Sequence, residues 1–78
     1  MENRSIRRTL YKVLRKTGVP RKEIELEASF KEDLRFDHVD WALFLFYLEK
    51  SFNISINDDA VLRLKRVKDS LELVKSIA

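Results

Sequence analysis

Apolar residues recur with a helical period near both ends of the chain. In residues 5–17 they form one stripe with the spacing i, i+4, i+7 and i+8, made of Ile6, Leu10, Val13 and Leu14. The opposite side of this segment is basic. Toward the other end, an i, i+4 and i+7 stripe is made of Val67, Leu71 and Val74. Such stripes are typical of amphipathic helices, and we predict one helix in each segment.

Turn-forming residues place the end of the first helix. Gly18 suits the position just after a helix and Pro20 cannot continue one, so this helix should end near Thr17. A long polar connection then runs to Asp37. Its apolar residues, expected to anchor it to the core, are Ile24, Leu26, Phe30 and Leu34. Ordered loops of this length are uncommon and are usually functional.

A second helix is predicted from His38 to about Phe52. Asp37 is its expected N-cap, because a carboxylate there can accept hydrogen bonds from the first-turn amides and is favoured by the helix dipole. Eight consecutive residues in the middle of this helix are apolar. A short helix should follow a second N-cap, Asn57, and extend through Leu64.

Composition favours an all-α fold in one domain. The chain of 78 residues has one glycine and one proline, which leaves little turn chemistry for a multi-stranded sheet. Its length is that of a single domain, residues 1–78. Its apolar runs are far shorter than the roughly 20 residues that a membrane-spanning helix needs, and the N-terminus has no apolar signal core. We therefore expect a cytoplasmic protein.

The net charge of +3 is unevenly distributed along the chain. Residues 1–22 carry eight basic side chains and one acidic one, whereas residues 23–40 carry two basic and seven acidic ones. The first helix could follow a phosphate backbone with Arg4, Arg7, Arg8, Lys12, Arg15 and Lys16. Tyr11 is the only aromatic residue among them, so we interpret this side as a solvated face and do not expect nucleic acid as a partner.

Residue types that support catalysis or metal binding are scarce. The chain has no cysteine and one histidine, His38, and it lacks both a glycine-rich phosphate loop and a nucleophile with a matching base. Asp37, His38 and Asp40 are close in sequence, but without a second histidine they are a weak metal signal. We predict neither an enzyme nor a metal site. Three roles stay open for His38: a surface residue at a helix end, a ligand or catalytic group, and a partner contact or pH sensor.

Several motifs in the middle of the chain occur together. They are Glu27-Ala28-Ser29-Phe30-Lys31-Glu32-Asp33-Leu34, Asp37-x-Val39-Asp40, Leu48-Glu49-x-x-Phe52, Ile56 and Val67. In these motifs the chain resembles the acyl carrier protein family, without gaps from Gly18 to about Val74. The resemblance implies an acyl-carrier-protein-like bundle of three main helices plus one short helix, with a long first loop.

The resemblance also implies a cofactor site, from which this chain departs. Members of the family carry acyl chains as thioesters on a phosphopantetheine arm, which is attached to the serine of a D-S-L motif. Here the equivalent position is His38, flanked by Asp37, Val39 and Asp40. An imidazole would give a labile phosphoramidate in place of a phosphodiester. The serines of the neighbouring segments lie outside this turn and are Ser29, Ser51 and Ser55. Phosphopantetheine is therefore not expected, and no other cofactor is predicted.

Placing successive residues 100° apart divides the second helix into two sides. Its core side is predicted to hold Val39, Ala42, Leu45, Phe46 and Phe52, with Trp41 and Leu48 at the edge. Its outward side is predicted to hold Asp40, Leu43, Tyr47, Lys50 and Ser51, with Phe44 at the margin. The rings of Phe44, Phe46 and Tyr47 should also fill the space in which the family lodges an acyl chain.

A helix that is apolar on every side is normally buried on every side. We therefore predict that the second helix binds a protein partner or a second copy of the chain. The residues expected at this contact are Trp41, Leu43, Phe44, Tyr47 and Lys50. Two of them, Leu43 and Lys50, occupy positions that are acidic in ordinary carriers. One alternative stays open, in which the loop near Leu26 and Phe30 folds over part of this face.

Three functions are compatible with these patterns. The leading hypothesis is a family member that cannot carry the arm and acts as a protein-binding or scaffold module through its second helix. The first alternative is a regulatory mimic that docks on the enzymes of true carriers. The second is an acyl or peptidyl carrier of fatty acid, polyketide or peptide biosynthesis whose attachment serine has been replaced by His38.

Overall fold

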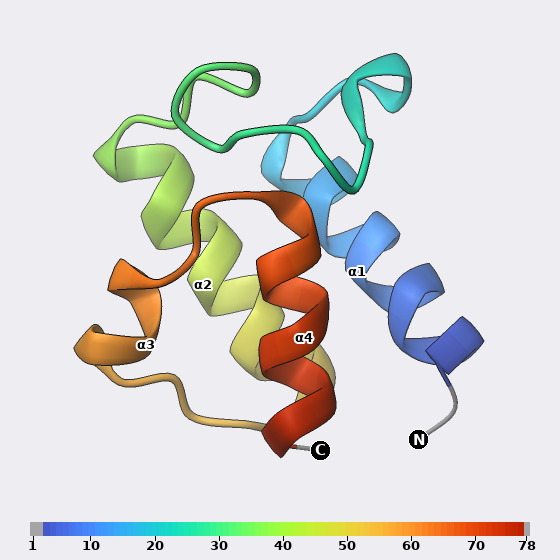
Figure 1. Cartoon of the computed structure of the whole chain (residues 1–78), viewed down its shortest axis with the longest axis vertical. Helices are drawn as coiled ribbons and strands as arrows, with labels where there is room; N and C mark the ends of the chain where they lie inside the picture. Colours follow the sequence, from blue (N-terminus) through green and yellow to red (C-terminus); the bar gives the residue numbers. More distant parts are fainter. Residues whose placement is uncertain (1–2, 78) are drawn as a thin grey trace.

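Three main helices and one short helix make up the described part of the chain, residues 3–77, in a computed structural model (Figure 1). The helices are α1 (Asn3–Thr17), α2 (His38–Phe52), α3 (Asp58–Leu62) and α4 (Val67–Ile77), and a 3-10 turn spans Arg21–Glu23. The predicted all-α bundle with a long first loop is therefore confirmed. Across residues 3–77, no helix is both long enough and apolar enough to cross a membrane.

Local signals place most helix ends where the sequence predicted them. α1 ends at Thr17, and Gly18 follows with φ +111°, a left-handed conformation that glycine adopts without strain. At the start of α3, the Asn57 side chain accepts a hydrogen bond from the amide of Ala60 at 2.8 Å. α3 ends at Leu62 and not at Leu64, so its predicted extent was too long. Beyond Leu62 the amides of Arg63 and Leu64 donate to the carbonyls of Ala60 and Val61, three residues back, and the Leu64 side chain is buried.

The long loop between α1 and α2 is held by backbone hydrogen bonds and by buried side chains. The amide of Phe30 donates to the carbonyl of Lys65, and the amide of Val67 donates to the carbonyl of Ala28, each at 3.0 Å. The side chains of Ala28 and Phe30 are buried. Leu26, which was expected as an anchor, is exposed to 38 %. The loop therefore crosses one end of the bundle, above α4 in Figure 1, as an ordered segment.

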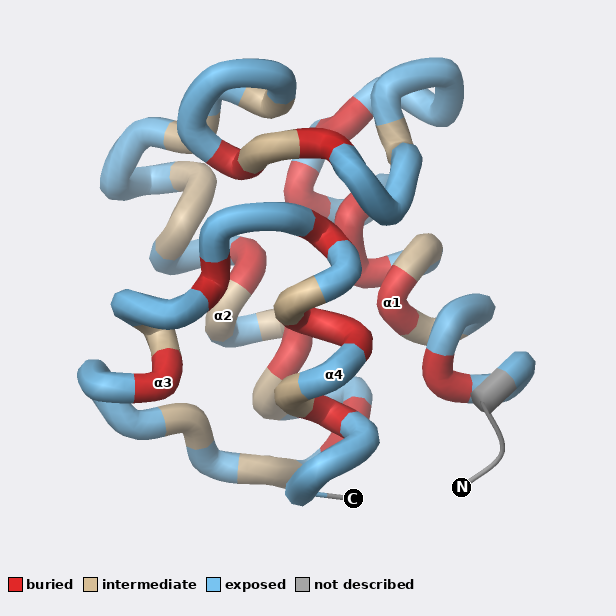
Figure 2. Tube along the Cα trace, viewed as in Figure 1, coloured by how far each residue is buried: buried red, intermediate tan, exposed pale blue. Residues whose placement is uncertain are grey.

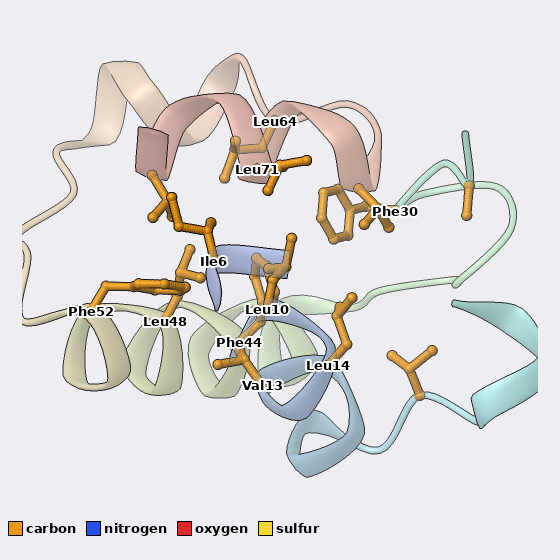
Figure 3. Close-up of a cluster of buried hydrophobic side chains, with 14 residues drawn as sticks. Ile6, Leu10, Val13, Leu14, Phe30, Phe44, Leu48, Phe52, Leu64 and Leu71 are labelled. Carbon is orange, nitrogen blue, oxygen red and sulfur yellow. The ribbon is translucent and has the colours of Figure 1, made fainter. Parts of the chain in front are cut away.

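One hydrophobic core lies between α1, α2 and α4 (Figures 2 and 3). The α1 stripe is buried as predicted and consists of Ile6, Leu10, Val13 and Leu14. α4 contributes its own predicted stripe, Val67, Leu71 and Val74. The long loop adds Val19, Ala28 and Phe30. In Figure 3 the labelled side chains of α2 point from that helix toward α1.

The predicted rotation of α2 about its axis was wrong. Its buried residues are spaced i, i+4 and i+8, and they are Phe44, Leu48 and Phe52. Of the residues assigned to its core side, Phe52 is buried and Leu45 is half-buried, but Val39, Ala42 and Phe46 are exposed. In a helix that is apolar nearly all round, hydrophobicity alone does not select a core side. The neighbouring rings of the long loop make that selection.

Candidate functional site

The turn that opens α2 is fixed by two carboxylates. The amide of Asp40 donates to Oδ1 of Asp37 at 2.9 Å, and the amide of Asp37 donates to Oδ2 of Asp40 at 3.0 Å. This reciprocal arrangement is a capping box, and it confirms Asp37 as the N-cap. The hydrogen bond from the backbone of Asp40 is the main cause that lowers the pKa of Asp37 below its ordinary value. His38 follows as the first residue of the helix, with an exposed side chain.

The segment that leads into this turn holds one residue in an unusual backbone conformation. Arg35 has φ +53°, in the left-handed region that side chains other than glycine, asparagine and aspartate rarely adopt. It lies between Leu34 and Phe36, which are both half-buried. The amide of Phe36 donates to the carbonyl of Phe30 at 2.9 Å, which ties the entry of α2 to the long loop. The turn is therefore held in place from both sides of Arg35.

The chemistry of the turn is that of carboxylates and one imidazole. Residues 30–41 contain neither serine nor threonine. The hydroxyl of Ser29 accepts a hydrogen bond from the amide of Glu32 at 3.1 Å, and Ser51 lies near the other end of α2, on the order of 20 Å along the helix axis. No group of three potential metal-ligating side chains occurs within the described range 3–77. The turn therefore contains no aliphatic alcohol oxygen.

Four aromatic rings pack behind the turn. The Phe30 ring centroid lies 4.9 Å from that of Trp41 and 5.2 Å from those of Phe36 and Phe44. Phe44 is fully buried among them. Phe44 therefore lies in the interior, whereas Phe46, with 56 % of its surface exposed, lies outside the core, so the expectation that the Phe46 ring fills interior space was wrong. These contacts orient α2, because Phe44 can join the cluster only if this side of the helix faces inward.

The opposite side of α2 presents an apolar stripe to solvent. Val39 is exposed to 52 %, Leu43 to 39 % and Phe46 to 56 %. Their spacing of i, i+4 and i+7 puts all three on one side of the helix, and Lys50 continues the same line. We call these four residues the α2 stripe. Sequence reasoning missed Val39 and Phe46 as surface residues, although both lie opposite Phe44, Leu48 and Phe52 on the helix.

Two contacts between a lysine and an aromatic ring lie at this surface, one within the stripe and one beside it. The ammonium of Lys50 lies 5.5 Å from the ring centroid of Phe46, and that of Lys16, on α1, lies 5.9 Å from the centroid of Tyr47. The Phe46 and Tyr47 rings are in edge contact, with centroids 5.6 Å apart. Both distances between ammonium and ring are within the range of cation–π attraction. The lysine side chains are therefore held over the rings at this surface.

The five residues predicted to contact a partner are found in different environments. Leu43 and Lys50 are exposed, and Tyr47 and Trp41 are half-buried. Phe44 is fully buried, so its placement at the margin of the outward side was wrong. The alternative in which the loop folds over part of this face is confirmed for Phe44, because the Phe30 ring packs against it. It does not hold for Leu43, which stays exposed to 39 %.

Comparison with known proteins gives a consistent result. No protein-family model matches the chain. The acyl carrier protein of Nitratidesulfovibrio vulgaris is 33 % identical over 64 residues, which are 82 % of this chain and 84 % of that protein. The acyl carrier protein of Porphyromonas gingivalis is 36 % identical over 63 residues, 81 % of each chain. That of Trieres chinensis is 36 % identical over 59 residues, 76 % of this chain and 74 % of its own.

Proposed function

The chain belongs to the acyl carrier protein family, and from that membership we propose that it carries no phosphopantetheine arm and acts by binding another protein through the α2 stripe. Acyl carrier proteins are not themselves enzymes, and the proposed role needs no catalytic residue. The observation that carries the proposal is His38, an exposed first residue of α2 at the position where the family has its attachment serine.

The missing alcohol oxygen supports the first half of the proposal. A stable phosphodiester to the arm requires an aliphatic hydroxyl, and the imidazole of His38 would form a phosphorus–nitrogen bond instead. The capping box of Asp37 and Asp40 fixes the backbone of the turn at which His38 lies. The proposed loss therefore concerns one functional group and leaves the scaffold that presented it in place.

The α2 stripe supports the second half. Large apolar side chains that line up on one exposed side of a helix are characteristic of a surface that another protein covers. Completing the burial of one such side chain contributes up to about 1.5 to 3 kcal/mol, less for a side chain already half-buried. Val39, Leu43 and Phe46 together therefore offer enough apolar surface for a weak to moderate complex, after the costs of association are subtracted.

Intact-mass measurement after incubation with a phosphopantetheinyl transferase and coenzyme A tests the first half. We expect no change in mass for the natural chain or for the His38→Ala variant. The His38→Ser variant, in which the alcohol oxygen is restored in an otherwise unchanged turn, should gain the mass of one arm. An arm on the natural chain would contradict the proposal.

The second half of the proposal, binding through the α2 stripe, is tested by substituting Phe46, the aromatic residue at the centre of the stripe. We expect Phe46→Glu to leave the helix content and the free energy of unfolding nearly unchanged, because that side chain is more than half exposed. The same variant should lose binding to any partner of the natural chain. The exposed residue Ser51, one turn beyond Tyr47 and not part of the stripe, provides the matched control Ser51→Glu.

A further inference from the structure

We propose that the partner of the α2 stripe is an acidic amphipathic helix of another protein, with carboxylates beside an apolar ridge and at one end of it. This inference rests on the proposed function, because it names the chemistry of the partner at the same surface. It also decides against a second copy of this chain, which the sequence left open as an occupant.

The charge at this surface carries the argument. Lys50 lies at one end of the stripe, and Lys16 lies over Tyr47 on the neighbouring helix α1. Lys12 is one turn before Lys16 and therefore lies on the same side of α1. Among residues 3–77, ion pairs within 4 Å join Lys68 to Glu27 and Lys75 to Glu72, so none of the three lysines of this surface is paired.

The carboxylates of α2 do not neutralise these lysines. Asp40 is part of the capping box at the start of the helix. Glu49 is half-buried, and its Oε2 accepts a hydrogen bond from the amide of Ile56 at 2.6 Å, on the way to α3. The C-terminal half of the stripe is therefore an apolar surface with unpaired positive charge at its end, from Lys50, and on the side of α1, from Lys16. A covering surface that supplies carboxylates there would gain from electrostatic complementarity.

A symmetric pair of this chain would bring like charges together. In a two-fold interface the same patch lies against itself, so Lys16 and Lys50 of one copy would face the same basic patch of the other. Like charges brought together at an interface oppose association. The apolar stripe alone would permit a dimer, whereas its lysines disfavour one.

The dimensions of the surface favour a helix as the occupant. From Val39 to Lys50 the stripe covers eleven residue steps of α2, which is about 16 Å or three helical turns. An amphipathic helix of similar length can place residues at i, i+3, i+4 and i+7 along such a line. A carboxylate near one end of that ridge would then reach Lys50, and a carboxylate on the flank that faces α1 would reach Lys16.

A selection from a display library of amphipathic helical peptides tests the inference without a known partner. The peptides keep a leucine and phenylalanine ridge, and Glu, Lys or Gln is randomised at the flanking positions. The natural chain should enrich peptides with glutamate at the flanks. The double variant Lys16→Glu, Lys50→Glu should bind the enriched peptides at least about tenfold more weakly than the natural chain does. It should itself enrich peptides with lysine at the flanking positions.

The control is the double variant Lys22→Glu, Lys65→Glu, which changes the net charge equally at exposed lysines outside α1 and α2. It should enrich the same acidic peptides as the natural chain. Circular dichroism confirms that each variant is folded before its selection is compared. If the control changes the selection as much as the stripe variant does, overall charge and not the stripe is responsible, and the inference is overturned.

Three further outcomes separate this inference from the proposed function. Enrichment of lysine-flanked or neutral peptides whose binding is lost in Phe46→Glu would overturn the acidic partner and leave docking through the stripe intact. Enriched peptides that bind Phe46→Glu as well as the natural chain would overturn docking itself. A dimer detected by sedimentation that Phe46→Glu abolishes would identify a second copy as the occupant, against the inference.

Discussion

Helices α1 and α2 have the same length of 15 residues and pack against each other, yet they distribute their apolar residues in opposite ways. In α1 one stripe holds the core residues, and none of Ile6, Leu10, Val13 and Leu14 is exposed by more than 3 %. In α2 one phenylalanine, Phe44, is fully buried while another, Phe46, is exposed to 56 %. An amphipathic pattern orients the first helix, whereas its neighbours orient the second.

This difference links the pattern of α2 to its proposed role. A bundle of this size needs one apolar stripe from each helix to close its core, and α1 supplies only that. α2 supplies the stripe of Phe44, Leu48 and Phe52 and then a second one on its far side. The second stripe contributes little to folding, since it stays in water, and its exposure is accounted for if another protein covers it.

The difference between the buried and the exposed side of α2 is tested most directly by truncating its two phenylalanines, Phe44 and Phe46, in separate variants. Phe44→Ala should lower the free energy of unfolding by about 3 to 5 kcal/mol, because it removes a ring from a fully packed site. Phe46→Ala should change it by less than about 0.5 kcal/mol, as for other surface positions. Urea unfolding followed by circular dichroism measures both.

If Phe44→Ala does not fold, the milder variant Phe44→Leu still tests the assignment. It should cost about 1 to 2 kcal/mol, within the ordinary range of core substitutions. Equal losses for truncation at positions 44 and 46 would show that both rings are buried, and the orientation of α2 described above would be wrong.

A smaller effect is expected at the entry of α2. Arg35 has a left-handed backbone with φ +53°, which costs a residue other than glycine about 1 to 2 kcal/mol. Arg35→Gly removes that strain but makes the unfolded chain more flexible, so the net gain in unfolding free energy should be about 0.5 to 1 kcal/mol. Asn53→Gly at the end of α2, φ +54°, should gain less, because asparagine tolerates this conformation. A gain at position 53 that exceeds the gain at position 35 would argue against strain at Arg35.

The smallest effect concerns the N-cap and depends on pH. The pKa of Asp37 is lowered in the folded chain, mainly by the hydrogen bond from the backbone of Asp40. Its contribution to stability is therefore complete above the pKa of the unfolded state, about 3.9, and is lost as the pH falls through the lower, folded value. Asp37→Asn keeps a capping oxygen that does not titrate, so the stability difference from the natural chain should shrink on acidification below about pH 4.

Thermal unfolding of both proteins between pH 7 and pH 2.5 measures this difference. Asp58→Asn serves as control, because Asp58 is an exposed aspartate in the first turn of α3, where Asn57 is the cap. A stability difference between the natural chain and Asp37→Asn that stays constant with pH would contradict the role of the ionised cap.

Much of the candidate site could be predicted because its signals are local. The cap at Asp37, the start of α2 at His38 and the absence of an alcohol oxygen in the turn follow from neighbouring residues alone. The outward position of Leu43 and Lys50 was also predicted and is confirmed by their exposure. Val39 and Phe46 could not be placed in the same way, because residues on every side of α2 are apolar and the periodic signal is nearly absent.

By itself, the sequence determined the all-α fold, the C-terminal end of α1, both ends of α2, the caps Asp37 and Asn57, and the stripes of α1 and α4. Each depends on residues within a few positions of one another or on a strong helical period. Only the tertiary structure decided which side of α2 is buried. The rings of Phe30 and Phe36, from a distant part of the chain, close around Phe44 and leave Phe46 in solvent. Packing between segments selects the inward side when hydrophobicity does not distinguish one side from another.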